Sequence, residues 1–396
     1  MATITSDVHF DPWDDAIMAD PYPVFRRMRD EAPLYYNSEH DFFAVSRYGD
    51  VERAIVDRAN LISGKGGLIE LIRMGMEIPR GLIVFEDPPV HTIHRALLSR
   101  VFTPRAMAAI EPEVREFTAR VLDGLVGRDR FDAIAEIGSR IPIRVIGMLL
   151  GIPENDQDVL RGQLAESMEH PDRDDLLSAN DESDDMFGAY LDWRVEHPSD
   201  DVMTMLLNAE FEDEKGMTRR LERPELLMLV NVLAGAGIDT TNRLIGWTVK
   251  ILSDHPDQRA MVAAEPSLLA NTIEEILRYE GPTYYFARAV VNDIEFQGET
   301  VPAGSILAVL PASANRDERR FEDPDTFDVR RDIGHILTFG FGAHYCLGAS
   351  LARLEGQVVL DEMLRRFPKW QVDEDKSSLF PGAFFRGWET LPVIVG

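Results

Sequence analysis

The segment 339–348 constrains this chain most, because it sets the only cysteine, Cys346, between glycines at fixed positions. It reads Phe-x-x-Gly-x-His-x-Cys-x-Gly, with Gly342 before the thiol and Gly348 after it. Glycine lets the backbone turn tightly and approach a flat group without a Cβ clash. Backbone N–H groups of such a loop point at a thiolate and tune a metal bound to it. The alternative is an inert buried cysteine, the usual state of a lone thiol, and five matched positions argue against it.

A helix is predicted to begin just after Gly348, in the run Ala349-Ser350-Leu351-Ala352. The N-terminus of a helix favours a nearby thiolate over the thiol. The segment therefore indicates a thiolate that binds a metal in a shielded loop.

The composition is that of a folded protein, with 45% hydrophobic and 28% charged residues. No linker and no internal repeat divides the chain, so we expect a single large domain over residues 1–396. The first residues lack the pattern of a secretory signal, and no run of about 18 apolar residues is present, so no membrane insertion is expected. One cysteine cannot form an internal disulfide, which favours the reducing cytoplasm.

The formal net charge of −28 argues against binding to nucleic acids and to anionic membrane surfaces. Acidic residues are densest in 154–214, which we interpret as a solvated loop between helices.

The longest helix is predicted over residues 224–254. Pro224 suits a first turn, Glu225 favours the positive end of the helix dipole, and His255-Pro256 ends the helix. About 30 residues of helix span roughly 45 Å, enough to cross a domain of this size. The fold class expected is mainly α with small β-sheets. Further helices are expected at 10–33, 48–57, 68–74, 90–140, 143–150 and 266–279, with two more in 154–200, and strands at 34–36, 42–46, 294–296, 300–301 and 306–310.

Inside this helix lies Ala234-Gly235-Ala236-Gly237-Ile238-Asp239-Thr240-Thr241. Two glycines in a helix interior cost about 1 kcal/mol each relative to alanine, so a packing or binding role should offset them. A threonine hydroxyl there bonds either a carbonyl one turn back or a ligand. Taken alone, Asp239 and Thr240 are simply a polar pair at a helix kink; together with the Cys346 loop they indicate a reaction site.

These two motifs resemble those of the cytochrome P450 family, in which a cysteine thiolate is the axial ligand of haem iron. The resemblance covers nearly the whole chain and implies haem b, iron protoporphyrin IX, as the cofactor. It implies that Cys346 binds the iron and that Thr240 hydrogen-bonds the dioxygen being activated, with Asp239 as the proton-relay acid. Other residues that the resemblance places beside the haem are Ala236, Gly237 and Gly348.

Haem carries two propionates, which require cations and N–H donors. The residues at matching family positions are His91, Arg95, Arg288 and His344. His94 and Arg100 are off the matched spacing. The resemblance also implies a structural triad of Glu275, Arg278 and Arg331 that fixes the cysteine loop.

The substrate pocket is predicted to be apolar, which suits a hydrophobic organic substrate. Its walls are expected from the irregular stretch 62–86, the acidic helix pair, Leu233, Ala236 and Thr240, the stretch 283–286, and Phe384 with Phe385. Arg73 and Arg80 are expected to face water.

The resemblance implies a monooxygenase that inserts one oxygen atom of O₂ into its substrate, with electrons from NAD(P)H delivered by a separate ferredoxin-type carrier. A basic patch of Arg100, Arg105 and Arg353 is expected to meet that acidic carrier. Two alternatives are a haem-binding or sensing protein without turnover and a peroxide-driven haem enzyme; the intact Asp239-Thr240 pair argues against both. Terpenoids, steroids, fatty acids, aromatic acids and polyketides are all compatible substrates.

Overall fold

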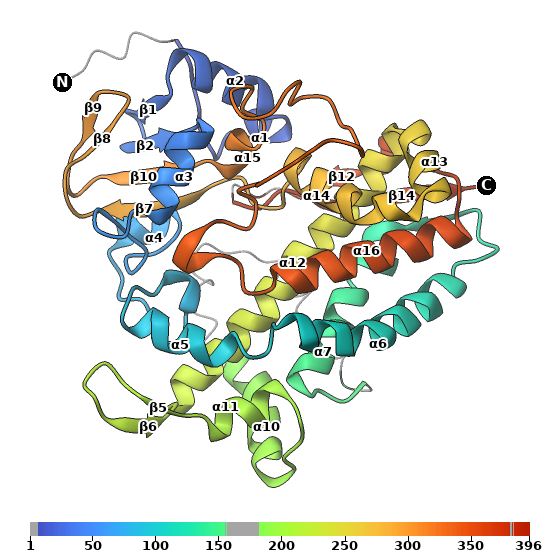
Figure 1. The fold of residues 1–396 in the computed structure, drawn as a ribbon, viewed down its shortest axis with the longest axis horizontal. Coiled ribbons are helices and arrows are strands. Elements are labelled where there is room, and N and C mark those ends of the chain that lie inside the picture. Colours follow the sequence, from blue (N-terminus) through green and yellow to red (C-terminus); the bar gives the residue numbers. More distant parts are fainter. Residues whose placement is uncertain (1–6, 155, 157–181, 381, 383) are drawn as a thin grey trace.

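The computed structural model describes residues 7–154, 156, 182–380, 382 and 384–396. Within that part the chain is mainly helical with small sheets, as predicted (Figure 1). The α-helices are α1 (Asp15–Ala19), α2 (Tyr22–Glu31), α3 (Tyr48–Val56), α4 (Ile69–Met74), α5 (Val90–Leu98), α6 (Pro104–Asp123), α7 (Ile141–Leu150), α10 (Glu182–Glu196), α11 (Val202–Asn208), α12 (Arg223–Asp254), α13 (Pro256–Ala264), α14 (Leu269–Tyr279), α15 (Pro311–Ala314) and α16 (Ala349–Arg366). A π-helical turn covers Ile134–Gly138, and 3-10 turns cover Ile83–Phe85, Pro266–Leu268, Gly342–His344 and Glu374–Lys376.

The strands form one larger sheet and several small ones. The larger sheet has the order β1 (Leu34–Asn37), β2 (Phe42–Val45), β10 (Ile306–Val309), β7 (Phe286–Val290), β3 (Leu61–Ile62). β10 runs parallel to β2, and the other neighbours are antiparallel. The small sheets are β11 (Trp370–Val372), β14 (Pro392–Val395) and β4 (Arg130–Asp132), and the pairs β12 (Ser378–Leu379) with β13 (Trp388–Thr390), β5 (Glu210–Glu212) with β6 (Thr218–Arg220), and β8 (Ile294–Phe296) with β9 (Glu299–Val301).

The helix α12 organises the molecule, since it runs through the middle with α7, α14 and α16 packed against it (Figure 1). A capping box begins it: the backbone N–H of Glu222 donates to Glu225 Oε2 at 2.9 Å, while the Glu222 carboxylate accepts from the N–H of Glu225. The main hydrophobic core surrounds α12 and extends from Leu34 to Val393, so both ends of the chain contribute to it. This arrangement places the middle of α12 deep in the fold.

Several sequence predictions differ from the structure. The stretch 90–140 is not helical throughout: α5 and α6 are separate, and β4 follows because Phe131 packs into the main core while β14 pairs with it. Gly127, with φ of 88°, supports the change of direction. The helix α13 and the hairpin β5–β6 were also missed. Most of the predicted helix pair in 154–200 lies outside the described residues, although α10 confirms a helix in its second half.

Candidate active site

The cysteine loop is a tight turn that ends in a helix. The backbone N–H of Cys346 donates to the carbonyl of Phe339 at 2.9 Å, and that of Tyr345 donates to Gly342 at 3.2 Å. Gly340 and Gly342 have φ values of 67° and 71°, in the left-handed region that favours glycine. α16 begins at Ala349, directly after Gly348, as predicted.

The sulfur of Cys346 is accessible at the surface of this loop. The surrounding protein nevertheless displaces most of the water near it, and burial raises the pKa of the thiol. Opposing this, the N–H groups of Gly348 and Ala349 and the charges of Arg95 and Arg353 favour the thiolate. Gly348 lies next to the thiol, since a Cβ at this position would be 4.0 Å from the sulfur. The local groups thus suit a thiolate whose charge is also neutralised by a bound metal ion.

The middle of α12 carries an accessible stretch although the helix is central. Gly235 and Ala236 are exposed, and a Cβ at Gly235 would meet no atom within 4 Å. Gly237 has the opposite role, because a Cβ there would lie 2.4 Å from Ile146 Cδ1 of α7. The two glycines of the motif therefore serve different purposes: Gly235 leaves room beside the helix, and Gly237 lets α7 pack closely.

Two arginine and two histidine side chains gather around the cysteine loop. The rings of His91 and His344 lie 4.1 Å apart, and Arg95 Nη2 donates to the carbonyl of Tyr345 at 2.5 Å. Arg288, buried on β7, donates to the carbonyl of Ala287 at 2.9 Å. Burial lowers the pKa of Arg288 to about 10 and, together with the charges of His91, Arg288 and Arg95, lowers the pKa of His344 to about 3.

Neither Arg95 nor Arg288 forms an ion pair within the described residues. The charge of Asp87 acts on Arg288, but the Asp87 oxygens accept from the backbone N–H groups of Ser63 and Gly64 at 3.0 and 2.7 Å. One buried and one half-buried guanidinium beside a metal-binding thiol, neither paired directly with a carboxylate, fit a cofactor that carries two carboxylates. The residues present therefore fit a haem with its propionates.

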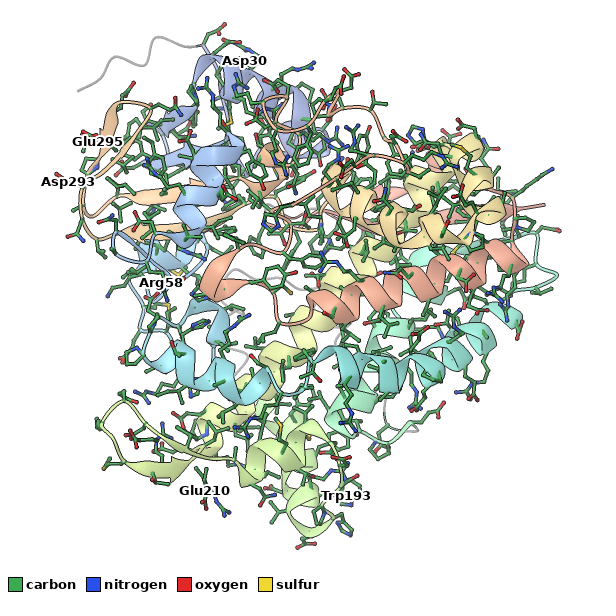
Figure 2. The ribbon with its side chains drawn as sticks, in the orientation of Figure 1. Asp30, Arg58, Trp193, Glu210, Asp293 and Glu295 are labelled. Carbon is green, nitrogen blue, oxygen red and sulfur yellow. The ribbon has the colours of Figure 1, made fainter. Side chains whose placement is uncertain are left out.

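Two contacts of this cluster were missed from the sequence. Ser63 Oγ lies 3.3 Å from His344 Nε2, and Arg58, directly after α3, lowers the pKa of both His91 and His344 (Figure 2). Neither residue stands in a motif, so only the folded structure brings them to the site.

On α12, Thr240 Oγ1 donates to the carbonyl of Ala236 at 2.7 Å. Asp239 forms a two-pronged ion pair with Arg243, one turn later, at 2.9 and 3.1 Å. Arg243 was not predicted from the sequence, although a carboxylate and an arginine four residues apart on a helix are a recognisable pair. Among the described residues, no hydrogen bond or ion pair joins this group to the cysteine loop, although α12 and α16 pack together.

The predicted pocket walls differ in how accessible they are, and their role stays a prediction. Leu233 and Thr240 are half-buried and Ala236 is exposed, so all three are available to a ligand, and Phe384 and Phe385 are also half-buried. Tyr284 and Tyr285 were predicted as walls, but they are buried in a second hydrophobic core with Phe10, Phe25 and Phe42.

Arg73 and Arg80 are exposed, as expected, and each also has a protein partner. Arg73 donates to the carbonyl of His40, while Arg80 pairs with Glu214 and lies 3.5 Å from Glu225. Both guanidinium groups already have protein partners, so neither is available to bind a substrate carboxylate.

The triad is present as predicted. Arg278 Nε lies 2.7 Å from Glu275 Oε2, Arg331 Nε lies 3.0 Å from Glu275 Oε1, and the N–H of Asp328 also donates to Glu275 at 3.0 Å. The Glu275–Arg278 pair is fully buried rather than on the helix surface. It joins α14 to the segment that leads to the cysteine loop.

Of the three arginines predicted to form a basic patch, Arg353 is paired with a carboxylate. Arg100 and Arg105 are exposed. Arg353, however, pairs with Glu274, donates to Tyr345 Oη at 3.1 Å, and lies 4.5 Å over the ring of Phe339. Its guanidinium is paired with a carboxylate, and the residue supports the cysteine loop.

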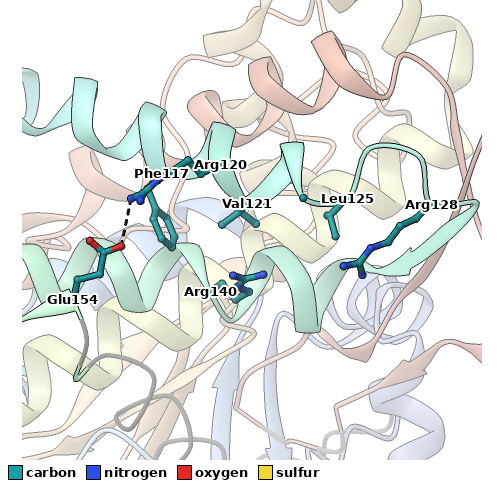
Figure 3. A pocket seen from close by; sticks show the side chains of 8 residues that line it. Phe117, Arg120, Val121, Leu125, Arg128, Arg140 and Glu154 are labelled. Carbon is teal, nitrogen blue, oxygen red and sulfur yellow. Dashed lines mark hydrogen bonds and ion pairs between the residues drawn. The ribbon is translucent and has the colours of Figure 1, made fainter.

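A surface groove of about 270 Å³ lies between α6 and α7, apart from this constellation (Figure 3). Its arginines already have carboxylate partners: Arg120 bonds Glu154 at 3.4 Å, and Arg128 and Arg140 share Glu136 at 2.9 and 3.3 Å. The groove shares no lining residue with the site. Separately, no helix within the described ranges is long and apolar enough to cross a membrane.

Comparisons with known proteins agree with this geometry. The family model described as Cytochrome P450 matches residues 178–383. The chain is 36% identical to a putative cytochrome P450 123 of Mycobacterium tuberculosis over 97% of this chain and 96% of that protein. It is 32% identical to a vitamin D(3) 25-hydroxylase of Pseudonocardia autotrophica, over 100% and 98% of the two chains. The solved structure of cytochrome P450 CYP109Q5 from Chondromyces apiculatus superposes with a TM-score of 0.87 at 34% identity, covering 98% of each chain.

Proposed function

The chain belongs to the cytochrome P450 family and is a haem-dependent monooxygenase, and we propose that it binds haem b between α12 and the cysteine loop and oxidises a hydrophobic organic substrate. The observation that carries the proposal is the pair of cations Arg95 and Arg288 beside the accessible thiol of Cys346, neither of them in an ion pair within the described residues.

In this arrangement Cys346 would bind the iron, and Arg95, Arg288, His91 and His344 would hold the propionates. Gly348 would lie beside the bound group next to Cys346, and the exposed Ala236 of α12 would face it, whereas Gly237 would contribute through its close packing against Ile146 of α7. Bound haem supplies the redox chemistry that divides O₂ between the substrate and water.

The residues of α12 would manage protons. Because the hydroxyl proton of Thr240 is committed to Ala236, the oxygen of Thr240 offers its lone pairs and accepts a hydrogen bond from a protonated group beside it. Asp239, whose two oxygens are held by Arg243, would take up a proton on a carboxylate oxygen and pass it toward Thr240.

The electron donor is proposed to be a ferredoxin-type carrier, with Arg100 and Arg105 as the exposed cations that meet it. A hydrophobic substrate is supported by the apolar character of Leu233, Phe384 and Phe385. The names of similar proteins include a vitamin D(3) hydroxylase and a complex with erythromycin B, which leaves the substrate class broad.

We also propose that residues 1–396 form one domain, which is supported by the main core that joins Leu34 to Val393. The cytoplasmic location expected from the sequence stays a prediction.

The test uses the purified holoenzyme and its Cys346→Ala variant. The wild-type protein should give the thiolate-type spectrum of the reduced carbon-monoxide complex, and the variant should not, because no other cysteine exists in the chain. Product formation should require NADH with a ferredoxin and its reductase. Activity with hydrogen peroxide alone would favour the peroxide-driven alternative, and haem binding without turnover in either system would favour the sensing alternative.

A further inference from the structure

Arg243 is almost completely buried, with 3% of its side chain exposed, although it carries a full charge on the central helix. Its Nε and Nη2 donate to the two carboxylate oxygens of Asp239 at 3.1 and 2.9 Å. Such a two-pronged pair fixes the plane of the carboxylate as well as its position. The acid that the proposed function uses is therefore not free to rotate in this structure.

The guanidinium of Arg243 is itself held by aromatic rings from another part of the chain. It lies 4.3 Å over the ring of Phe380 and 5.3 Å over that of Phe385. A buried cation over aromatic faces is stabilised by the ring quadrupoles. The path of the side chain also requires Gly387, since a Cβ there would lie 2.6 Å from Arg243 Cγ.

These rings sit on a loop that is anchored at its base. The N–H of Phe380 donates to the carbonyl of Gly387 at 2.9 Å, and the N–H of Tyr284 donates to the carbonyl of Phe384 at 3.1 Å. Phe385 also forms an isolated β-bridge with Thr283. Phe380 and Phe385 are thus each held in place by backbone contacts.

We propose that Arg243 is the positioning residue for Asp239, and that the C-terminal loop with Phe380 and Phe385 sets the direction in which Asp239 offers its proton. Arg243 would act through the carboxylate that it holds. The inference rests on the proposed function, because it assigns Arg243 a role only if Asp239 delivers protons.

The experiment compares holoenzymes carrying Asp239→Asn, Arg243→Met, Arg243→Lys and the double change Asp239→Asn/Arg243→Met. A positioned general acid contributes about 10²- to 10⁴-fold, so loss of its orientation should lower product formed per NADH by about tenfold. Arg243→Met and Asp239→Asn should each show this loss, and the double variant should be no worse than either. Lysine keeps the charge but not the planar fork, so Arg243→Lys should recover part of the ratio.

Readouts other than turnover separate orientation from folding. Haem content and the dissociation constant of an azole ligand should stay within about twofold of the wild-type values, since roughly twofold is a difference well below 1 kcal/mol. A crystal structure of the Arg243→Met holoenzyme should show the Asp239 carboxylate turned from its present direction. Phe380→Leu, which removes one supporting ring, should lower the same ratio by a smaller factor.

Arg259 provides the matched control. It is also buried, lies 4.3 Å over the ring of Trp370, and donates to the carbonyls of Leu252 and Trp370 at 3.0 and 2.8 Å. Arg259→Met should lower thermal stability and leave the product-to-NADH ratio unchanged. If Asp239→Asn lowers the ratio while Arg243→Met behaves like Arg259→Met, the positioning role of Arg243 is wrong. If neither change at 239 nor at 243 lowers the ratio, the proton-relay role of Asp239 in the proposed function is wrong as well.

Discussion

Thr240 donates its hydroxyl proton to the carbonyl oxygen of Ala236, one turn earlier in α12, at 2.7 Å. The hydroxyl therefore satisfies a helix carbonyl and still presents two lone pairs away from the helix. Because this proton is already given to Ala236, Thr240 can only accept a hydrogen bond from a group beside the helix, and Asp239 is the group that would supply the proton.

Thr240→Ala should retain haem and substrate binding but lower the amount of product formed per NADH, with hydrogen peroxide released instead. A preorganised hydrogen-bonding group in an active site is typically worth about 2.7–4 kcal/mol. NADH, product and peroxide measured in one assay give the comparison. Thr240→Ser keeps the hydroxyl and should stay close to the wild type, while Thr240→Val should resemble alanine; equal coupling in all four proteins would contradict the role.

Glu355 on α16 should make the protein less stable as the pH rises. Its carboxylate is fully buried, both oxygens lack hydrogen-bond partners within the described residues, and burial raises its pKa to about 8 from 4.5. Between these values the unfolded chain releases a proton that the native state keeps, so the stabilisation present below pH 4.5 is lost at about 1.4 kcal/mol per pH unit up to pH 8. Glu355→Gln should abolish this slope and gain about 3 kcal/mol near pH 7.

Thermal unfolding midpoints of the wild type and of Glu355→Gln, measured from about pH 5 to about pH 8, test this effect. Glu362, on the same helix and also buried, is the control because Arg115 and Arg366 pair with it. Glu362→Gln should lose stability where Glu355→Gln gains it. Parallel pH curves for wild type and Glu355→Gln would show that Glu355 is not the group responsible.

Glu275→Gln should destabilise the protein severely, because it leaves the buried guanidinium of Arg278 without its counter-charge. Removal of one partner of a buried pair typically costs about 3–5 kcal/mol. Glu274→Gln, on the same helix but in a partly exposed pair with Arg353, should cost much less. Apparent unfolding midpoints and haem content report both; similar losses at the two positions would count against a special role for the buried triad.

Higher ionic strength should slow electron delivery from the carrier more than it weakens substrate binding. Attraction between exposed charges is screened beyond about 10 Å at 0.1 M salt, whereas an apolar substrate is little affected. Arg105→Glu should reproduce the high-salt defect at low salt. Arg353→Met should not reproduce this defect, because Arg353 is paired with Glu274. It should instead disturb the cysteine loop, because Arg353 donates a hydrogen bond to Tyr345. Reduction rates that do not change with salt or with Arg105→Glu would remove the basic-patch hypothesis.

The sequence predicted the elements whose signals are local. The bounds of α12 are nearly those read from Pro224 and His255, because end signals and a long apolar run decide them. The Cys346 loop and the start of α16 follow from glycines at fixed spacing. β4 and the hairpin β5–β6 were missed because three-residue strands take their stability from partners far along the chain.

The same limit applies to the site. His91, Arg95 and His344 were found because they stand in motifs, whereas Ser63 and Arg58 reach the cluster only through folding. Tyr284 and Tyr285 were placed in the pocket because they are large and apolar, properties that pocket walls and core residues share. Burial, not residue type, separates these cases.

The close approach of α7 to α12 couples the residues that evolution can accept at positions 237 and 146. A Cβ on Gly237 would lie only 2.4 Å from Ile146 Cδ1, the end of a flexible side chain, so an alanine at 237 requires this methyl group to move or a smaller side chain at 146. Relatives that carry alanine at the first position should therefore more often carry valine or alanine at the second. An engineer who wishes to reshape the centre of the long helix should change both residues together, since two residues in contact have effects that do not simply add.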